Sequence, residues 1–332
     1  MSDIDNALRY QLPEADAQRI FREQIVPGEL ARGVPQERPA VVFVIGQPGA
    51  GKTRTTDAIK EQLDQRGGAV VVNSDVYKAY HPQYSRLLAE NDRTAAPLTS
   101  ADGRRWTAMS EAHLIAGRVD TIIETTARNP AYFAEQVARY RSAGYRVEAA
   151  ILAVPEAASR LGIVHRYHDQ VQQLGHGRFT PQANHDDSYY GVSAVARAID
   201  KYQLADAVTV YRRGNVQVGV NYLAGGAGEP GAGEWRWPER STTRTLDIER
   251  NRQWTPEETR AFASTLAQLG KEMGPAWHQE LTAIGNLALP FAAPGTGTAG
   301  RTQPTAGQQF QQAADRPHQA PGADQGRSDS SR

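Results

Sequence analysis

The 332-residue chain contains no cysteine, which excludes disulfide bonds, thiol catalysis and cysteine-ligated zinc. It also carries no net charge, because 37 Lys and Arg residues balance 37 Asp and Glu residues, whereas nucleic-acid binders usually show a basic excess. No apolar run approaches the ~20 residues that span a bilayer, and residues 1–20 are too polar for a secretory signal. We therefore expect a cytoplasmic protein without nucleic-acid or membrane partners.

One stretch carries a specific chemical signal. It reads Gly46-Gln47-Pro48-Gly49-Ala50-Gly51-Lys52-Thr53 and matches G-x-x-x-x-G-K-[ST], the phosphate-binding P-loop. A β-branched and aromatic run at residues 41–45 precedes it, and residues 54–65 carry apolar side chains at helical spacing. In this strand–loop–helix order, backbone N–H groups and the helix N-terminus converge on phosphate oxygens. We predict ATP binding, with Lys52 at the β- and γ-phosphates and the Thr53 hydroxyl as a Mg²⁺ ligand.

Strand-like and helix-like segments alternate through residues 1–222, which we assign to one domain. Strands are expected at residues 41–45, 69–72, 119–123, 146–154 and 207–211, with 216–222 added at an edge, and helices at 13–26, 54–65, 106–117, 130–143, 155–174 and 187–203. Residues 85–104 are polar and are expected to form a surface excursion. This alternation predicts an α/β fold of the P-loop NTPase type, a mainly parallel sheet with helices on both faces. Ligands bind at the carboxyl ends of such strands, where the P-loop, Asp75 and Glu124 should converge.

The composition changes after residue 223. Residues 223–240 are rich in glycine and are expected to form a flexible linker. Residues 241–290 form a helical extension, since Thr255-Pro256-Glu257-Glu258 is a capping box followed by apolar residues at helical spacing. Residues 291–332 contain almost no large apolar side chains and are expected to be a disordered tail. Everything beyond residue 222 should therefore be dispensable for catalysis.

Four charged residues stand where catalysis could use them, and each has a plainer interpretation. Asp75 ends the second strand and is either an acceptor base or the N-cap of the next helix. Glu124 ends the third strand and either organises Mg²⁺ and its water or has only a structural partner. Arg166 and Arg178 flank a glycine break and either bind phosphate oxygens or are solvated charges.

These residues also occur together in a recognisable pattern. The P-loop, Ser74-Asp75-Val76-Tyr77-Lys78-Ala79-Tyr80-His81-Pro82, Ile123-Glu124-Thr125-Thr126-Ala127-Arg128, Arg166-Tyr167 and Arg178-Phe179-Thr180-Pro181 resemble the zeta-toxin family of P-loop kinases. The resemblance covers roughly residues 18–222. It differs at Thr125, where the family usually has glycine.

The resemblance implies ATP-dependent phosphorylation of a UDP-N-acetylamino sugar, in particular UDP-N-acetylglucosamine at its 3′-hydroxyl. It assigns Lys52, Thr53, Arg166 and Arg178 to ATP and Mg²⁺, and Asp75 to the role of base. The predicted substrate site combines Asp75 with Glu111, Glu124, Thr126 and Arg128. An antitoxin that neutralises the kinase is an expected partner.

Two other functions fit the same residues. One is a kinase of the same fold with another acceptor, such as an antibiotic or a metabolite. The other is a nucleotide-gated interaction protein that uses the helical extension as its partner surface. Asp75 favours transfer over switching, because a switch positions water and does not need an acceptor base.

Overall fold

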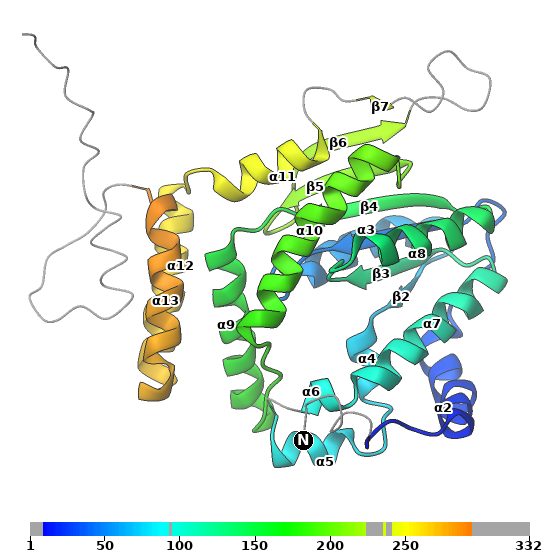
Figure 1. The fold of residues 1–332 in the computed structure, drawn as a ribbon, viewed down its shortest axis with the longest axis horizontal. Coiled ribbons are helices and arrows are strands. Elements are labelled where there is room, and N and C mark those ends of the chain that lie inside the picture. The colour runs from blue at the N-terminus through cyan, green and yellow to red at the C-terminus, as the bar shows by residue number, and fades with distance from the viewer. Residues whose placement is uncertain (1–8, 93–94, 224–234, 237–240, 294–332) are drawn as a thin grey trace, which may run out of the picture. The chain divides into compact units, whose positions relative to one another are not determined.

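The computed structural model describes residues 9–92, 95–223, 235–236 and 241–293 (Figure 1). The chain divides into two compact units, Met1–Asn251 and Arg252–Arg332. Within the described ranges, no helix combines the length and the apolar composition needed to cross a membrane.

The first unit is built on a seven-stranded sheet with the order β2–β3–β1–β4–β5–β6–β7. The first five strands are parallel and the last two pair antiparallel. Their bounds are β1 (Ala40–Ile45), β2 (Val70–Val72), β3 (Thr121–Thr125), β4 (Arg146–Leu152), β5 (Ala207–Arg212), β6 (Val216–Leu223) and β7 (Trp235–Arg236). The predicted mainly parallel α/β fold is confirmed.

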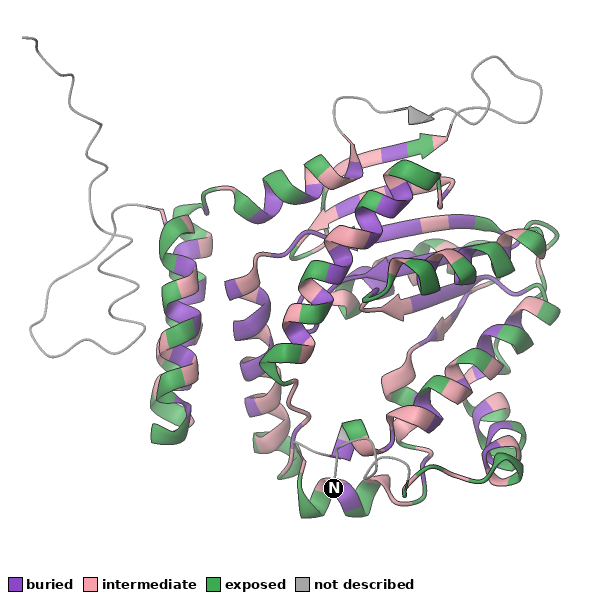
Figure 2. Ribbon diagram, in the orientation of Figure 1, coloured by how far each residue is buried: buried purple, intermediate pink, exposed green. Residues whose placement is uncertain are grey.

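The central strand β1 is buried on both faces, and most residues of the neighbouring β4 are buried as well (Figure 2). Its side chains alternate, so that Val41, Phe43 and Ile45 belong to one core cluster and Val42 and Val44 to another. The larger cluster includes residues of α2, α7, α8, α10 and α11, and the smaller one includes residues of α3. The helices are α2 (Glu14–Ile20), π-helical η1 (Phe21–Leu30), α3 (Lys52–Asp64), α4 (Ser74–Lys78), α5 (Tyr84–Glu90), α6 (Ala95–Leu98), α7 (Ser100–Ala116), α8 (Pro130–Ser142), α9 (Glu156–Leu174), α10 (Gln182–Tyr202) and α11 (Thr242–Asn251).

Residues 85–104 differ from their predicted surface excursion. They include most of α5, all of α6 and the start of α7, and both Leu87 and Thr99 are buried. Asp102 is also buried, and its carboxylate accepts a hydrogen bond from Leu12 N at 3.0 Å. Asp102 thus binds a backbone group 90 residues away in the chain, a contact that the sequence pattern could not reveal.

Helix α11 corrects the predicted end of the first domain at residue 222. The Asp200 carboxylate accepts hydrogen bonds from Thr242 N and Thr243 N at the start of this helix. Leu246 is fully buried in the larger core cluster. Glu249 accepts two hydrogen bonds from the Arg212 guanidinium, at 2.6 and 2.9 Å. The boundary therefore lies after Asn251, and the expected linker interrupts one unit instead of separating two.

The second unit contains α12 (Pro256–Glu272) and α13 (His278–Ala288), with 3₁₀ turns η2 (Pro275–Trp277) and η3 (Leu289–Phe291). The capping box is confirmed, since Thr255 Oγ1 accepts from Glu258 N at 3.2 Å and Glu258 Oε2 accepts from Thr255 N at 2.8 Å. Buried Phe262, Leu266 and Ile284 form its core. Most of the predicted linker and nearly all of the predicted tail lie outside the described residues.

Candidate active site

The P-loop follows β1 and leads into α3 through two glycines with positive φ. Gly49 has φ 75° and Gly51 has φ 87°, in the region where residues with a side chain are disfavoured. A Cβ atom on Gly49 would also stand 2.0 Å from Ser159 O of α9, so the loop passes directly against that helix. Both positions therefore need glycine for the loop to take this course.

Lys52 begins α3 and folds back over the loop. Its ammonium donates to Gly46 O at 2.9 Å and to Gln47 O at 3.4 Å. Burial lowers the pKa of Lys52 to about 8, although the nearby Glu124 and Asp75 carboxylates act in the opposite direction. Bound phosphates would supply negative charge that further favours the protonated form.

Asp75 is not the N-cap of the helix that follows β2. The cap is Asn73, whose side-chain oxygen accepts from Asp75 N at 2.9 Å. The Asp75 side chain, 36% exposed, pairs with Arg178 and accepts from Lys78 Nζ at 2.9 Å. Burial raises the pKa of Asp75, but Arg178 and Lys78 outweigh it and hold the pKa well below its usual range. The group is therefore an ionised carboxylate held between two cations.

The two predicted phosphate-binding arginines lie on the same side of the fold as Asp75. Arg166 belongs to α9, and burial, followed by the nearby Arg178 charge, lowers its pKa to about 10. Its Nε atom is buried and has no hydrogen-bond partner among the described residues. The backbone around Arg178 is held in place, since Gly177 N donates to Asp92 Oδ2 at 3.0 Å and Arg178 N to Gln170 Oε1 at 2.8 Å. Arg178 is paired with Asp75, so it is the unpartnered Nε of Arg166 that favours an anionic ligand here.

Glu124, at the end of β3, has a defined structural role. Its two carboxylate oxygens accept from Thr56 Oγ1 and from Asn73 Nδ2, each at 2.6 Å. The carboxylate thus ties the P-loop helix to the cap after β2. Thr125, which stands where glycine was expected, uses its hydroxyl locally and accepts from Ala127 N at 3.1 Å.

These groups line one cavity of about 590 Å³. Of the predicted site residues, it is lined by Pro48, Gly49, Gly51, Lys52, Thr53, Asp75, Glu124, Thr126, Arg166 and Arg178. The predicted convergence at the carboxyl ends of β1, β2 and β3 is therefore found in the structure. The basic side chains suit a polyphosphate. Among the described residues, no group of three or more His, Asp or Glu side chains could hold a metal ion.

A sequence model with the description Zeta toxin matches residues 29–221, which is more than half of the chain. The chain belongs to the zeta toxin family. It is 25% identical to Toxin zeta of Enterococcus hirae over 259 residues, which cover 78% of this chain and 83% of that protein. It is also 25% identical to Toxin PezT of Streptococcus pneumoniae over 186 residues, which cover 55% of this chain and 73% of that protein.

The fold of this zeta-toxin-family chain is similar to one found in the PezAT chromosomal toxin–antitoxin system of Streptococcus pneumoniae. The TM-score is 0.64 at 17% identity, and the match covers 78% of this chain and 98% of that chain. The family resemblance read from the sequence is confirmed. Membership of this family supports a phosphotransferase of the kinase type.

Two residues that the resemblance assigns to the sugar nucleotide do not line the cavity. Glu111 is buried in α7, where it accepts from Gln136 Nε2 at 2.9 Å and pairs with Arg139 at 3.4 Å. Burial raises the pKa of Glu111 to about 7, despite the opposing effect of Arg139. Arg128 is exposed, and its Nε donates to Ser188 Oγ at 3.0 Å. In this structure both residues are engaged elsewhere.

The cavity also contains residues that the sequence reasoning missed. Asn73, Tyr84, Gln170 and Arg213 are among its lining. Asn73 could have been identified, because an asparagine directly after a strand and before a helix is a typical N-cap. Arg213 carried no such signal, because it follows β5 and lies far from the P-loop in the sequence. In the structure its guanidinium donates to Ala158 O of α9 at 2.7 Å. Only the folded sheet brings it here.

Proposed function

We propose that this chain transfers the γ-phosphoryl group of ATP to a hydroxyl of a UDP-N-acetylamino sugar, the 3′-hydroxyl of UDP-N-acetylglucosamine. Support comes from family membership and from one geometric observation. That observation is one cavity in which the P-loop lysine Lys52, the Asp75 carboxylate at the start of α4, and the guanidinium groups of Arg166 and Arg178 lie together.

In the proposed reaction the acceptor oxygen attacks the γ-phosphorus in line, and the bond from that phosphorus to the β,γ-bridging oxygen breaks. Asp75 takes the proton of the attacking hydroxyl, and ADP leaves with the bridging oxygen. Lys52, Arg166 and Arg178 stabilise the negative charge on the transferring group. When bound, Mg²⁺ neutralises charge on the β- and γ-phosphates, with Thr53 as its protein ligand.

The Asp75–Arg178 ion pair fits this scheme as a resting contact. A γ-phosphate offers Arg178 a second anionic partner, and transfer of the guanidinium to it would leave Asp75 with Lys78 alone. The pKa of Asp75 would then rise from its depressed value, which would make the carboxylate a better base as the nucleotide arrives.

A panel of acceptors tests the proposal. ADP release should be fast with UDP-N-acetylglucosamine and slow with UDP-glucose, which lacks the acetamido group. Equal turnover of unrelated alcohols would refute the proposed substrate class while leaving the kinase chemistry in place.

A second candidate, a kinase of the same fold with another small-molecule acceptor, is favoured by a specific observation. Glu111 and Arg128, which the resemblance assigns to the sugar nucleotide, are bound to Gln136 and Ser188 and do not line the cavity. If Glu111→Gln and Arg128→Ala leave turnover of UDP-N-acetylglucosamine unchanged, these side chains do not hold it.

We also propose an antitoxin as a protein partner, one that would act by covering the nucleotide cavity. Such a partner should compete with ATP. A purified complex should therefore show no ATP binding in calorimetry, and ATP binding at full affinity in the complex would contradict this mode of inhibition.

A further inference from the structure

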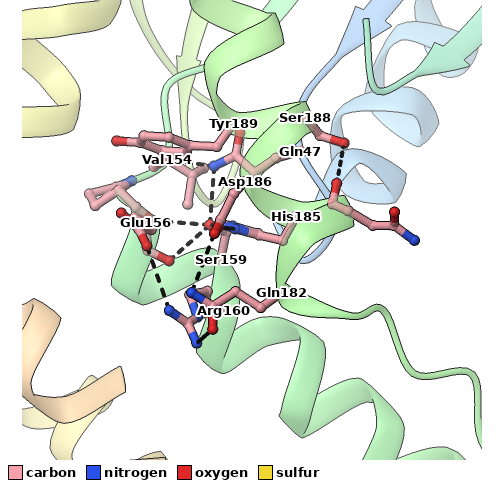
Figure 3. A network of polar contacts seen from close by, with 12 residues as sticks. Gln47, Val154, Glu156, Ser159, Arg160, Gln182, His185, Asp186, Ser188 and Tyr189 are labelled. Carbon is pink, nitrogen blue, oxygen red and sulfur yellow. Dashed lines mark hydrogen bonds and ion pairs between the residues drawn. The ribbon is translucent and has the colours of Figure 1, made fainter. Parts of the chain in front are cut away.

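One side chain of the P-loop points into the protein and not toward the cavity. Gln47 is fully buried, and its Nε2 donates to Val154 O at 2.8 Å and to Ser159 Oγ at 3.2 Å (Figure 3). Ser159 is in turn hydrogen-bonded to His185 Nε2 at 2.8 Å. The amide thus anchors the loop to the start of α9 and to α10. Its remaining polar atom, Oε1, accepts from Arg250 Nη2 at 3.0 Å.

Arg250 comes from the last turn of α11, 203 residues further along the chain. Only 3% of it is exposed, and its Nη1 donates to Tyr189 O at 3.1 Å and to Ser193 Oγ at 2.9 Å. The guanidinium carbon lies 4.0 Å from the centre of the Tyr189 ring. These partners are all neutral groups. A buried cation held by neutral acceptors and one ring is costly unless every contact is well placed.

The helix that carries Arg250 is itself held firmly against the rest of the first unit. The Asp200 carboxylate binds its N-terminal backbone, and Glu249 binds the Arg212 guanidinium with both oxygens. Arg250 therefore reaches the P-loop from a helix that these contacts hold in place. Helix α11 lies beyond residues 29–221, so the family match does not include this contact.

The P-loop needs such an anchor because its glycines allow its backbone many conformations. Gly49 and Gly51 both have positive φ, and glycine samples many alternatives to these conformations. Phosphate binding requires one conformation in which the N–H groups converge. Gln47 lies between β1 and these glycines, and its buried amide fixes the direction in which the loop leaves the strand.

We propose that Arg250 is a positioning residue for nucleotide binding, which holds Gln47 and through it the P-loop in the phosphate-binding conformation. Helix α11 is thereby part of the nucleotide site, although Arg250 does not touch the nucleotide. This proposal rests on the proposed use of ATP. It concerns nucleotide binding alone, so it can fail or hold independently of which hydroxyl is phosphorylated.

The test measures the dissociation constant of Mg²⁺–ATP by calorimetry in the full chain, without an acceptor. Arg250→Met keeps a long side chain and removes the charge-assisted hydrogen bond, and it should weaken ATP binding about tenfold. Arg244→Met is the matched control, because it is the same substitution at an exposed position of the same helix. It should leave the ATP dissociation constant within about twofold of wild type.

A double-variant cycle separates positioning from general stability. If Arg250 acts through Gln47, the variant with both Gln47→Leu and Arg250→Met should bind ATP no more weakly than Gln47→Leu alone. Additive losses would overturn the proposal, as would an Arg250→Met protein that binds ATP like wild type. If Arg250→Met does not fold, Arg250→Lys replaces it. Lysine keeps the charge and cannot bind all three acceptors at once, so unchanged ATP affinity in that variant would also overturn the proposal.

Discussion

Asparagine in place of Asp75 should separate catalysis from nucleotide binding. In the structure the Asp75 carboxylate pairs with Arg178 and accepts from Lys78 Nζ. Asparagine has nearly the same shape, and its amide oxygen can still accept a hydrogen bond from either Arg178 or Lys78. The amide cannot take a proton from the acceptor hydroxyl. Loss of a positioned general base costs typically 10²–10⁴-fold in rate, which corresponds to about 3–5 kcal/mol of activation free energy.

ATP binding should survive this substitution or become tighter. Removal of the carboxylate takes one negative charge away from the site of the phosphates, and it releases Arg178 and Lys78 from a competing partner. Lys52→Ala should behave differently, because it removes a group that acts on the phosphates themselves. It should weaken ATP binding and abolish transfer together.

The assay pairs the ATP dissociation constant with the single-turnover transfer rate of each variant. Asp57→Asn is the charge-matched control, since Asp57 is exposed on α3 and does not line the cavity. It should leave both quantities unchanged. An Asp75→Asn enzyme that transfers within about threefold of wild type would remove Asp75 from the role of base, because a lost base costs far more. A variant that no longer binds ATP would make Asp75 a structural residue.

Two further predictions follow from the site and from the unit boundary. Because the pKa of Lys52 is about 8 and phosphate binding favours its charged form, ATP affinity should be full below pH 8 and should fall about tenfold by pH 9. Lys52→Arg, whose guanidinium stays charged, should remove this pH dependence, and an equally steep loss in that variant would contradict the assignment. A chain ended after Asn251 should keep the ATP affinity and transfer rate of the full chain, whereas one ended at residue 223 should lose stability because it lacks α11 and the buried Leu246. Thermal melting and transfer rates of the two shortened chains check this, and equal behaviour of both would show that α11 contributes nothing.

The fold and the centre of the site could be read from the sequence because their signals are local. The P-loop pattern, the β-branched run before it and the alternation of strands and helices each lie within short windows. The parallel order then follows from general rules, which place Lys52, Asp75 and Glu124 at one edge of the sheet. The capping box at Thr255 is equally local, and it marks the start of α12.

What could not be read depends on contacts between distant residues. Helix α11 follows a glycine-rich stretch that resembles a domain linker, and nothing in its ten residues reveals that Arg250 reaches Gln47. The sequence left Asp75 open between acceptor base and helix N-cap, and the hydrogen bond from Asp75 N to Asn73 Oδ1 assigns the cap to Asn73. Glu111 shows that a family motif has limits too. The motif assigns Glu111 to the substrate, but in the structure its carboxylate accepts a hydrogen bond from Gln136.

The most direct test of the account is the product of a reaction that contains the full chain, Mg²⁺–ATP and UDP-N-acetylglucosamine. Mass spectrometry should show the sugar nucleotide with one added phosphate, and phosphorus-31 NMR should place that phosphate on the 3′-hydroxyl. The Asp75→Asn protein should yield almost none under the same conditions. If the wild-type protein binds ATP, yet leaves UDP-N-acetylglucosamine unmodified while it phosphorylates another alcohol, the proposed substrate is contradicted.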